Sequence, residues 1–140
     1  MKVSTHFFYS LILAAILYPI FNWKAVFILI GGVLIDIDHY FWHVFKYNKF
    51  NFFDCYNYYL ERMDKEKIME NIGLLLIFHT VEFLLLITLF SFYNNLALIF
   101  TIGVISHYLL DLIFLYSVPK RFIANHSIIL WVIKNKIQKI

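Results

Sequence analysis

The chain has 140 residues, of which 62% are hydrophobic and only 15% are charged, and its mean hydropathy is +0.74. This composition excludes an ordinary water-soluble domain, and the length allows one domain, 1–140, built as a helical bundle in lipid. The formal charge of +3 is modest and Cys55 is the only cysteine, so the sequence predicts neither a disulfide framework nor a cysteine zinc site.

Four apolar stretches predict membrane-spanning helices at 5–21, 25–45, 72–93 and 96–118. Turn residues separate them, with Pro19 and Asn22 after the first stretch and Asn94-Asn95 after the third. The loop 46–71 is aromatic and then charged, and it predicts a short amphipathic helix. The tail 121–140 predicts another, lying on the membrane surface. The expected fold is therefore an all-α, integral membrane four-helix bundle with an interfacial amphipathic C-terminal helix.

The basic residues predict an orientation for this bundle. Eleven of the twelve Lys and Arg residues fall in the N-terminus, the loop 46–71 and the tail, and only Lys24 falls on the other side. By the positive-inside rule both termini and the loop are cytoplasmic. The many Phe, Ile, Asn and Lys residues suggest an AT-rich genome, so we expect a prokaryotic cell membrane. Acidic residues balance the basic ones in the loop, and we expect no nucleic-acid partner.

The apolar stretches carry carboxylates that have no basic residue near them in sequence. No Lys or Arg lies between Lys24 and Lys46, or between Lys67 and Lys120. A carboxylate at the centre of a membrane helix costs about 2.5–3.5 kcal/mol. The compensating charge must therefore be histidinium, bound protons or a cation from outside the chain.

The depth and spacing of these residues favour a cation. At a rise of 1.5 Å per residue, histidines and carboxylates from three predicted spans fall in one slab of the inner half of the bilayer. Three- and four-residue steps place His79 with Glu82, and His107 with Asp111, on common helix faces. Small residues, Gly32 and Gly103, would let the helices approach closely. The expected metal ligands are His6, Asp36, His39, His79, His107 and Asp111.

Two carboxylates remain as candidate catalytic bases, Glu82 and Asp38. Asp38 lies two residues from Asp36 and would point nearly the opposite way in a regular helix. Either the helix distorts after Gly31-Gly32 or Asp38 serves a neighbouring group, and the sequence leaves both alternatives open.

Mixed imidazole and carboxylate ligands suit a divalent metal, with Zn expected and Mn or Fe as alternatives. Six ligands exceed what one tetrahedral Zn requires. The additional candidate ligands indicate either two metal ions, or one metal ion with a residue that acts as general acid or base.

Four segments together resemble the YdjM-like family of membrane-bound metal-dependent hydrolases and are more distantly similar to the zinc-dependent phospholipase C group. The segments are Thr5-His6, Ile35-Asp36-Ile37-Asp38-His39, Phe78-His79-Thr80, and Gly103-x-x-Ser106-His107-x-x-x-Asp111. The chain departs from the family pattern at Ile35, where the family has Pro, and it lacks the His-Arg-Gly half of the third motif.

The resemblance implies a metal-dependent hydrolase, and a site in the inner leaflet makes a membrane lipid or another phosphoester the natural substrate class. The missing Arg removes a phosphate clamp. The alternative is a membrane protein that binds or transports protons or a divalent cation, since buried carboxylates serve that role too. The sequence does not determine the oligomeric state.

Overall fold

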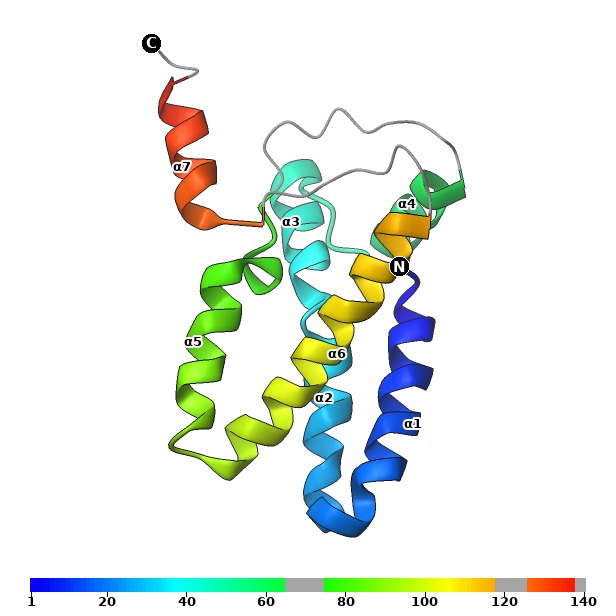
Figure 1. Cartoon of the computed structure of the whole chain (residues 1–140). Coiled ribbons are helices and arrows are strands. Elements are labelled where there is room, and N and C mark those ends of the chain that lie inside the picture. The colour runs from blue at the N-terminus through cyan, green and yellow to red at the C-terminus, as the bar shows by residue number, and fades with distance from the viewer. Residues whose placement is uncertain (65–74, 118–125, 138–140) are drawn as a thin grey trace.

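The computed structural model describes residues 1–64, 75–117 and 126–137, and within them the chain forms helices and no β-strand. Figure 1 shows helices packed side by side in a bundle, with further short helices at one end. In chain order the elements are α1 (Val3–Phe21), the 3-10 helix η1 (Asn22–Ala25), α2 (Val26–Leu34), α3 (Ile37–Tyr47), α4 (Phe52–Asp64), the 3-10 helix η2 (Ile77–His79), α5 (Val81–Ser91), α6 (Asn95–Ser117) and α7 (Ile128–Ile137).

The turns fall where the sequence predicts them. Asn22 ends α1 with a positive φ of 51°, a conformation that asparagine tolerates better than most residues. Before α6, the side chain of Asn94 accepts hydrogen bonds from the backbone N–H groups of Leu96 and Ala97, at 2.8 and 3.3 Å. These turns produce two helical hairpins, α1 with α2 and α5 with α6.

The two hairpins meet where α2 crosses α6, and the crossing depends on glycine. A Cβ atom at Gly103 would overlap the carbonyl oxygen of Ile28, and one at Gly31 would overlap the carbonyl oxygen of Phe100. A Cβ atom at Gly32 would overlap the hydroxyl of Ser10 on α1. The expectation that small residues allow close approach is therefore confirmed at this crossing.

The predicted span 25–45 is not one regular helix. The α-helical pattern stops at Leu34, and the chain tightens into i→i+3 hydrogen bonds, from Asp36 N–H to the carbonyl of Val33 and from His39 N–H to the carbonyl of Asp36. A new helix, α3, then starts at Ile37. The two alternatives for Asp38 occur together: the helix is distorted here, and the Asp38 carboxylate contacts neighbouring groups, His39 and His79.

The predicted span 72–93 also differs from the structure. Its first residues, 72–74, lie outside the described residues, and the segment that follows is a short 3-10 turn ending at His79. Thr80 is extended, and its hydroxyl caps α5 by accepting a hydrogen bond from Phe83 N–H at 3.3 Å. At 11 residues, α5 alone is shorter than the roughly 17 residues that a spanning helix needs.

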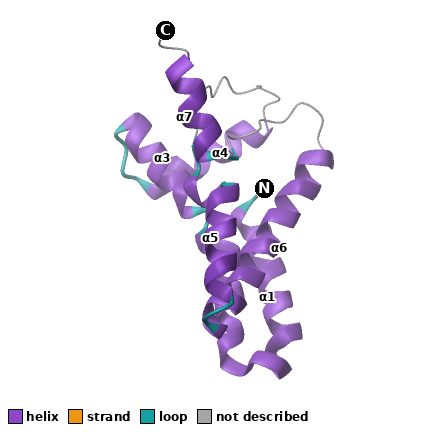
Figure 2. Cartoon of the chain, turned by 60° about the vertical axis from the view of Figure 1, so that its left-hand side comes forward, coloured by secondary structure: helices purple, strands orange, loops and turns teal. Residues whose placement is uncertain are grey.

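The shorter helices α3, α4 and α7 lie at one end of the molecule, above α1, α5 and α6 in Figure 2. Helix α4 falls in the loop 46–71, where the sequence predicts a short helix. Helix α7 falls in the tail 121–140. Residues 118–125 and 138–140 lie outside the described residues.

Two helical runs, Val3–Tyr47 and Asn95–Phe114, are long and apolar enough to cross a membrane. The first run folds back on itself at the turn after α1. Large apolar side chains face outward on these helices: Phe8, Ile12 and Ile16 follow one face of α1 and are each at least 60% exposed. Such a face is what lipid contact requires, whereas a soluble helix would carry polar residues there.

Candidate metal centre

Four side chains from three separate segments converge on one point inside the bundle. His107 comes from α6, His79 from η2, Asp36 from the α2–α3 break and Asp111 from one turn beyond His107. We call these four residues the central cluster. The Nε2 atoms of the two histidines are 3.2 Å apart.

The carboxylates lie around this pair of nitrogens. Asp36 Oδ1 is 3.6 Å from both Nε2 atoms, and Asp111 Oδ2 is 3.2 Å from the Nε2 of His107 and 3.9 Å from that of His79. A tetrahedral Zn site with bonds of about 2.1 Å separates its ligand atoms by about 3.4 Å. Asp36, His79 and His107 therefore have the spacing of a single-ion coordination shell, and Asp111 borders it at His107. The donors are the nitrogen and oxygen atoms that Zn, Mn and Fe accept.

The other nitrogen of each imidazole already has an acceptor. His79 Nδ1 donates to Asp38 Oδ2 at 3.0 Å, and His107 Nδ1 donates to the carbonyl oxygen of Gly32 at 2.9 Å. In a neutral imidazole the Nε2 atom then carries a lone pair and no proton. If both rings are neutral, two lone pairs face each other at 3.2 Å beside two carboxylates, and this arrangement requires positive charge between them, either a proton shared by the two rings or a bound cation.

Asp38 orients the histidines around it. Its Oδ2 accepts from His79 Nδ1 and from the backbone N–H of Phe78, and its Oδ1 accepts from His39 Nδ1, each at 3.0 Å. A carboxylate behind a ligating histidine is the usual second partner in metal sites, because it fixes the ring and raises its basicity. With three donors on its two oxygens, Asp38 is poorly placed to take a proton from water, the role expected from the sequence.

His39 lies beside the central cluster and not within it. Its Nδ1 is engaged by Asp38 and lies 3.7 Å from Asp36 Oδ1, and its ring meets the ring of His79 edge to face at 5.1 Å. The His39 side chain is 29% exposed, so it borders the surface. Asp38, His39 and His79 offer ligand atoms within 4.8 Å of one another, and Asp38 hydrogen-bonds to both histidines.

His6 reaches the cluster from α1 and is fully buried. Its Nε2 lies 3.2 Å from Asp111 Oδ1, the oxygen that faces away from His107 and His79. The amino nitrogen of Met1 lies 3.1 Å from the same oxygen. The structure thus brings His6 next to the central cluster, as the sequence predicts.

The structure does not bring Glu82 to the central cluster. The expectation that Glu82 shares a helix face with His79 is wrong, because the extended Thr80 separates the two residues. Glu82 instead accepts a hydrogen bond from the Ser127 hydroxyl at 2.6 Å and from the backbone N–H groups of Ile128 and Ile129. Its carboxylate caps the first turn of α7, where a negative charge is favourable.

Several side chains that support the site were not identifiable from the sequence motifs. The Tyr108 hydroxyl lies 2.8 Å from the carbonyl of Phe78 and 3.1 Å from that of Thr80, so it fixes the irregular segment that carries His79. On α4, burial raises the pKa of Tyr59, which stays protonated and donates to the carbonyl of His39 at 3.3 Å. Burial also raises the pKa of the Cys55 thiol, as expected of an inert cysteine.

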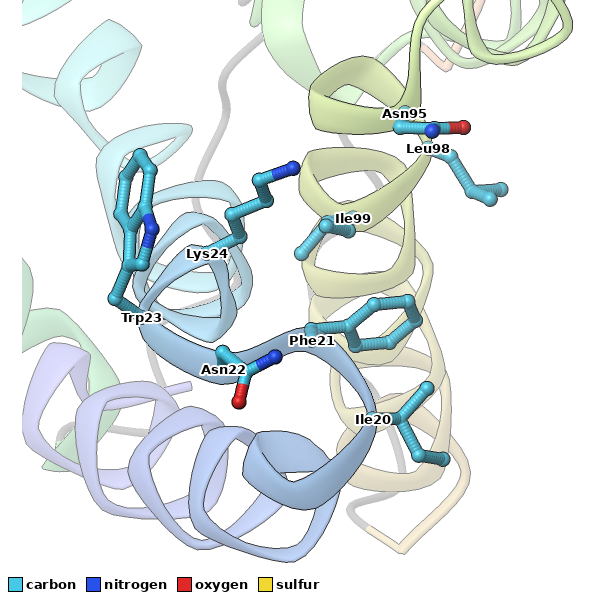
Figure 3. Close-up of a pocket in the computed structure, with 8 residues that line it drawn as sticks. All are labelled: Ile20, Phe21, Asn22, Trp23, Lys24, Asn95, Leu98 and Ile99. Carbon is cyan, nitrogen blue, oxygen red and sulfur yellow. The ribbon is translucent and has the colours of Figure 1, made fainter.

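A cavity of about 500 Å³ lies at the opposite end of the bundle. Figure 3 shows its lining at the α1–α2 turn and the start of α6, with Phe21 and Ile99 below and Lys24 reaching toward Asn95. The residues that line it carry no carboxylate or imidazole, so this cavity is separate from the metal centre.

No family model, curated protein or solved structure matches the chain.

Proposed function

We propose that the chain is an integral membrane protein with a divalent-metal centre that supports hydrolysis. One observation carries the proposal: the Nε2 atoms of His79 and His107 face each other at 3.2 Å, between the carboxylates of Asp36 and Asp111. Their Nδ1 atoms are held by other acceptors, so a cation is the simplest occupant of the space between them. The ordered motifs that resemble the YdjM-like hydrolases support the same reading.

The metal centre would lie near the cytoplasmic side. The two helical runs that can cross a membrane support insertion, and the eleven-to-one distribution of basic residues supports cytoplasmic termini. His6 is in the first turns of α1 and Asp111 in the later turns of α6, so both would sit toward the inner leaflet. A reporter fused after residue 140 should therefore read as cytoplasmic, and an external reading would overturn this orientation.

The donor set suits Zn, with Mn or Fe as alternatives. When bound, such an ion lowers the pKa of a coordinated water and polarises a carbonyl or phosphoryl oxygen. The chain's own residues hold and orient the ligands: Asp38 fixes the ring of His79, and the Gly32 carbonyl fixes that of His107.

We assign the proton acceptor to His39 Nε2. The other nitrogen of the same ring, Nδ1, donates a hydrogen bond to Asp38 at 3.0 Å. This leaves Nε2 with a lone pair that can accept a proton. The partial exposure of His39 provides access for water and substrate. Asp38 then orients two histidines at once, the metal ligand His79 and the base His39.

The substrate class we propose is a lipid or other phosphoester at the inner leaflet. A centre that borders the membrane surface can meet a lipid headgroup without extracting the lipid. A phosphoester also matches a positively charged metal centre, because charge develops on its oxygens during hydrolysis.

Transport of protons or a divalent cation is the rival function, and the packing of the bundle argues against it. Between the metal centre and the α1–α2 turn lies an apolar cluster formed by Ala14, Ala25, Ile28 and Ile99, and no buried charged residue accompanies it among the described residues. A transport path would need polar groups or water along this stretch. A centre reached from one side is what a hydrolase requires.

Metal analysis of the purified full-length chain tests the proposal, with Asp111→Asn as the informative variant. The amide keeps the shape of the side chain but loses the negative charge of a metal ligand. The amount of metal bound per chain should therefore fall far more than the stability of the fold. If no metal binds at Asp111, its charge is balanced by the Met1 amine and the neighbouring histidines, and the substitution should leave metal content unchanged. Unchanged metal content in the folded variant would overturn the hydrolase proposal.

The matched control is Asp54→Asn, because Asp54 is exposed on α4 and lies outside all the groups that could hold a metal. This control should retain the metal content of the unmodified chain. Hydrolysis of a phosphodiester in detergent, dependent on added metal, then separates an enzyme from a transport or binding protein.

A further inference from the structure

We propose that the chain holds a second divalent cation beside the first, with His6 Nε2 and Asp111 Oδ1 as its protein ligands. The inference rests on the proposed function, since it places the second ion next to the metal centre formed by the central cluster. It concerns the number of ions and the role of His6, which the central cluster does not use.

The ring planes of His6 and His107 disfavour binding to one ion, although their ligand atoms lie within 4.8 Å of each other. The rings are stacked, with ring centroids 3.7 Å apart and planes only 13° from parallel. An imidazole nitrogen holds a metal in the plane of its ring, and two nearly parallel planes meet only far beyond coordination distance. His107 Nε2 belongs to the central cluster, so an ion held by His6 is a second ion.

The ring of His6 is also left unsatisfied. His6 is 0% exposed, and its Nδ1 has no hydrogen-bond partner among the described residues. A buried polar group without a partner costs about 1–3 kcal/mol, so native proteins rarely leave one. The other nitrogen, Nε2, lies 3.2 Å from Asp111 Oδ1, so a cation bound between these two atoms would have one imidazole and one carboxylate ligand.

Asp111 is arranged to bridge two ions. Its Oδ2 faces His107 and His79 in the central cluster, while its Oδ1 faces His6 at 3.2 Å. Two stacked histidines about 3.7 Å apart would place their ions at a similar spacing, and two-metal hydrolytic sites hold their ions about 3.5–4 Å apart. Asp36 Oδ2 is a further buried carboxylate oxygen with no partner among the described residues, which adds to the demand for positive charge.

The competing explanation is that the Met1 amino group, 3.1 Å from Asp111 Oδ1, is the cation on that side. Under that explanation one ion per chain neutralises the site together with the amine. The two explanations differ in the number of metal ions bound, which can be measured without any substrate.

The experiment is titration of the metal-free, detergent-purified full chain with Mn²⁺, followed by elemental analysis and electron paramagnetic resonance. We expect two ions per chain. The first equivalent should give the signal of isolated Mn²⁺, and the second should convert it to that of an exchange-coupled pair. This result needs no substitution, so it does not depend on how well a variant folds.

His6→Phe keeps an aromatic ring stacked on His107 but has no nitrogen, and we expect it to bind one ion with no coupled signal. His6→Leu provides the same loss of ligand with a smaller side chain. The control His126→Phe changes an exposed histidine at the start of α7 and should bind two ions.

One ion in the unmodified chain, unchanged in the His6 variants, would overturn the second site and leave the metal centre intact. No bound ion in any protein would overturn the metal centre itself. The failure of this inference and that of the proposed function are therefore distinguishable.

Discussion

Replacing Asp38 by Asn tests how the metal centre is organised, because Asp38 touches the metal ligand His79 without being part of the central cluster. The carboxylate accepts three hydrogen bonds, two at Oδ2 and one at Oδ1. An amide has one acceptor oxygen and one donor group. If its oxygen faces His79 and Phe78, its NH₂ faces His39 Nδ1, and His39 must then present its other tautomer.

The expected effect of Asp38→Asn is a partial loss of metal affinity. His79 keeps an acceptor for Nδ1, so its ring stays oriented, but the acceptor is neutral and the ring becomes less basic. Removing such a supporting partner typically weakens metal binding about 10- to 100-fold. This corresponds to about 1.4–2.7 kcal/mol of binding free energy.

Competition with a chromophoric chelator measures this affinity in detergent, with Asp54→Asn as the control. Metal content at saturation should remain that of the unmodified chain. Unchanged affinity would show that Asp38 does not act through His79. Complete loss of metal would show that Asp38 is itself a ligand, and either result would refute the reasoning.

Three further outcomes follow from the contacts of single residues. Gly103→Ala should lower the thermal midpoint, since overpacking a helix crossing costs about 1–3 kcal/mol, and an unchanged midpoint would contradict the close approach of α2 and α6. Glu82→Gln should leave metal content unchanged. Amide hydrogen exchange in the first turn of α7 should become faster, because the carboxylate accepts hydrogen bonds from backbone N–H groups there. Loss of metal in this variant would show that Glu82 is a metal ligand. His39→Ala should slow metal-dependent phosphodiester hydrolysis about 10²- to 10⁴-fold without loss of metal, as expected for a general base, whereas loss of metal would make His39 a ligand.

The sequence by itself determined the class of fold and most of the candidate site. Long apolar runs bounded by turn residues dictate helices, and these are found at α1 and α6 close to the expected bounds. Carboxylates without nearby basic residues indicate a bound cation, since burying unpaired charge is costly. On this ground the carboxylates of Asp36 and Asp111 were predictable as candidate ligands, and the shared depth and spacing of His79 and His107 added the two histidines, which the structure brings together with them.

Only the tertiary structure decided which nitrogen or oxygen of each residue faces the centre. Helical periodicity assigns faces correctly only where the helix is regular, and it fails at the α2–α3 break and at the extended Thr80. The break turns Asp38 toward His79, and the extended residue sends Glu82 to α7. The stacking of His6 on His107 joins residues about a hundred positions apart, and such a long-range contact has no local pattern from which it could be read.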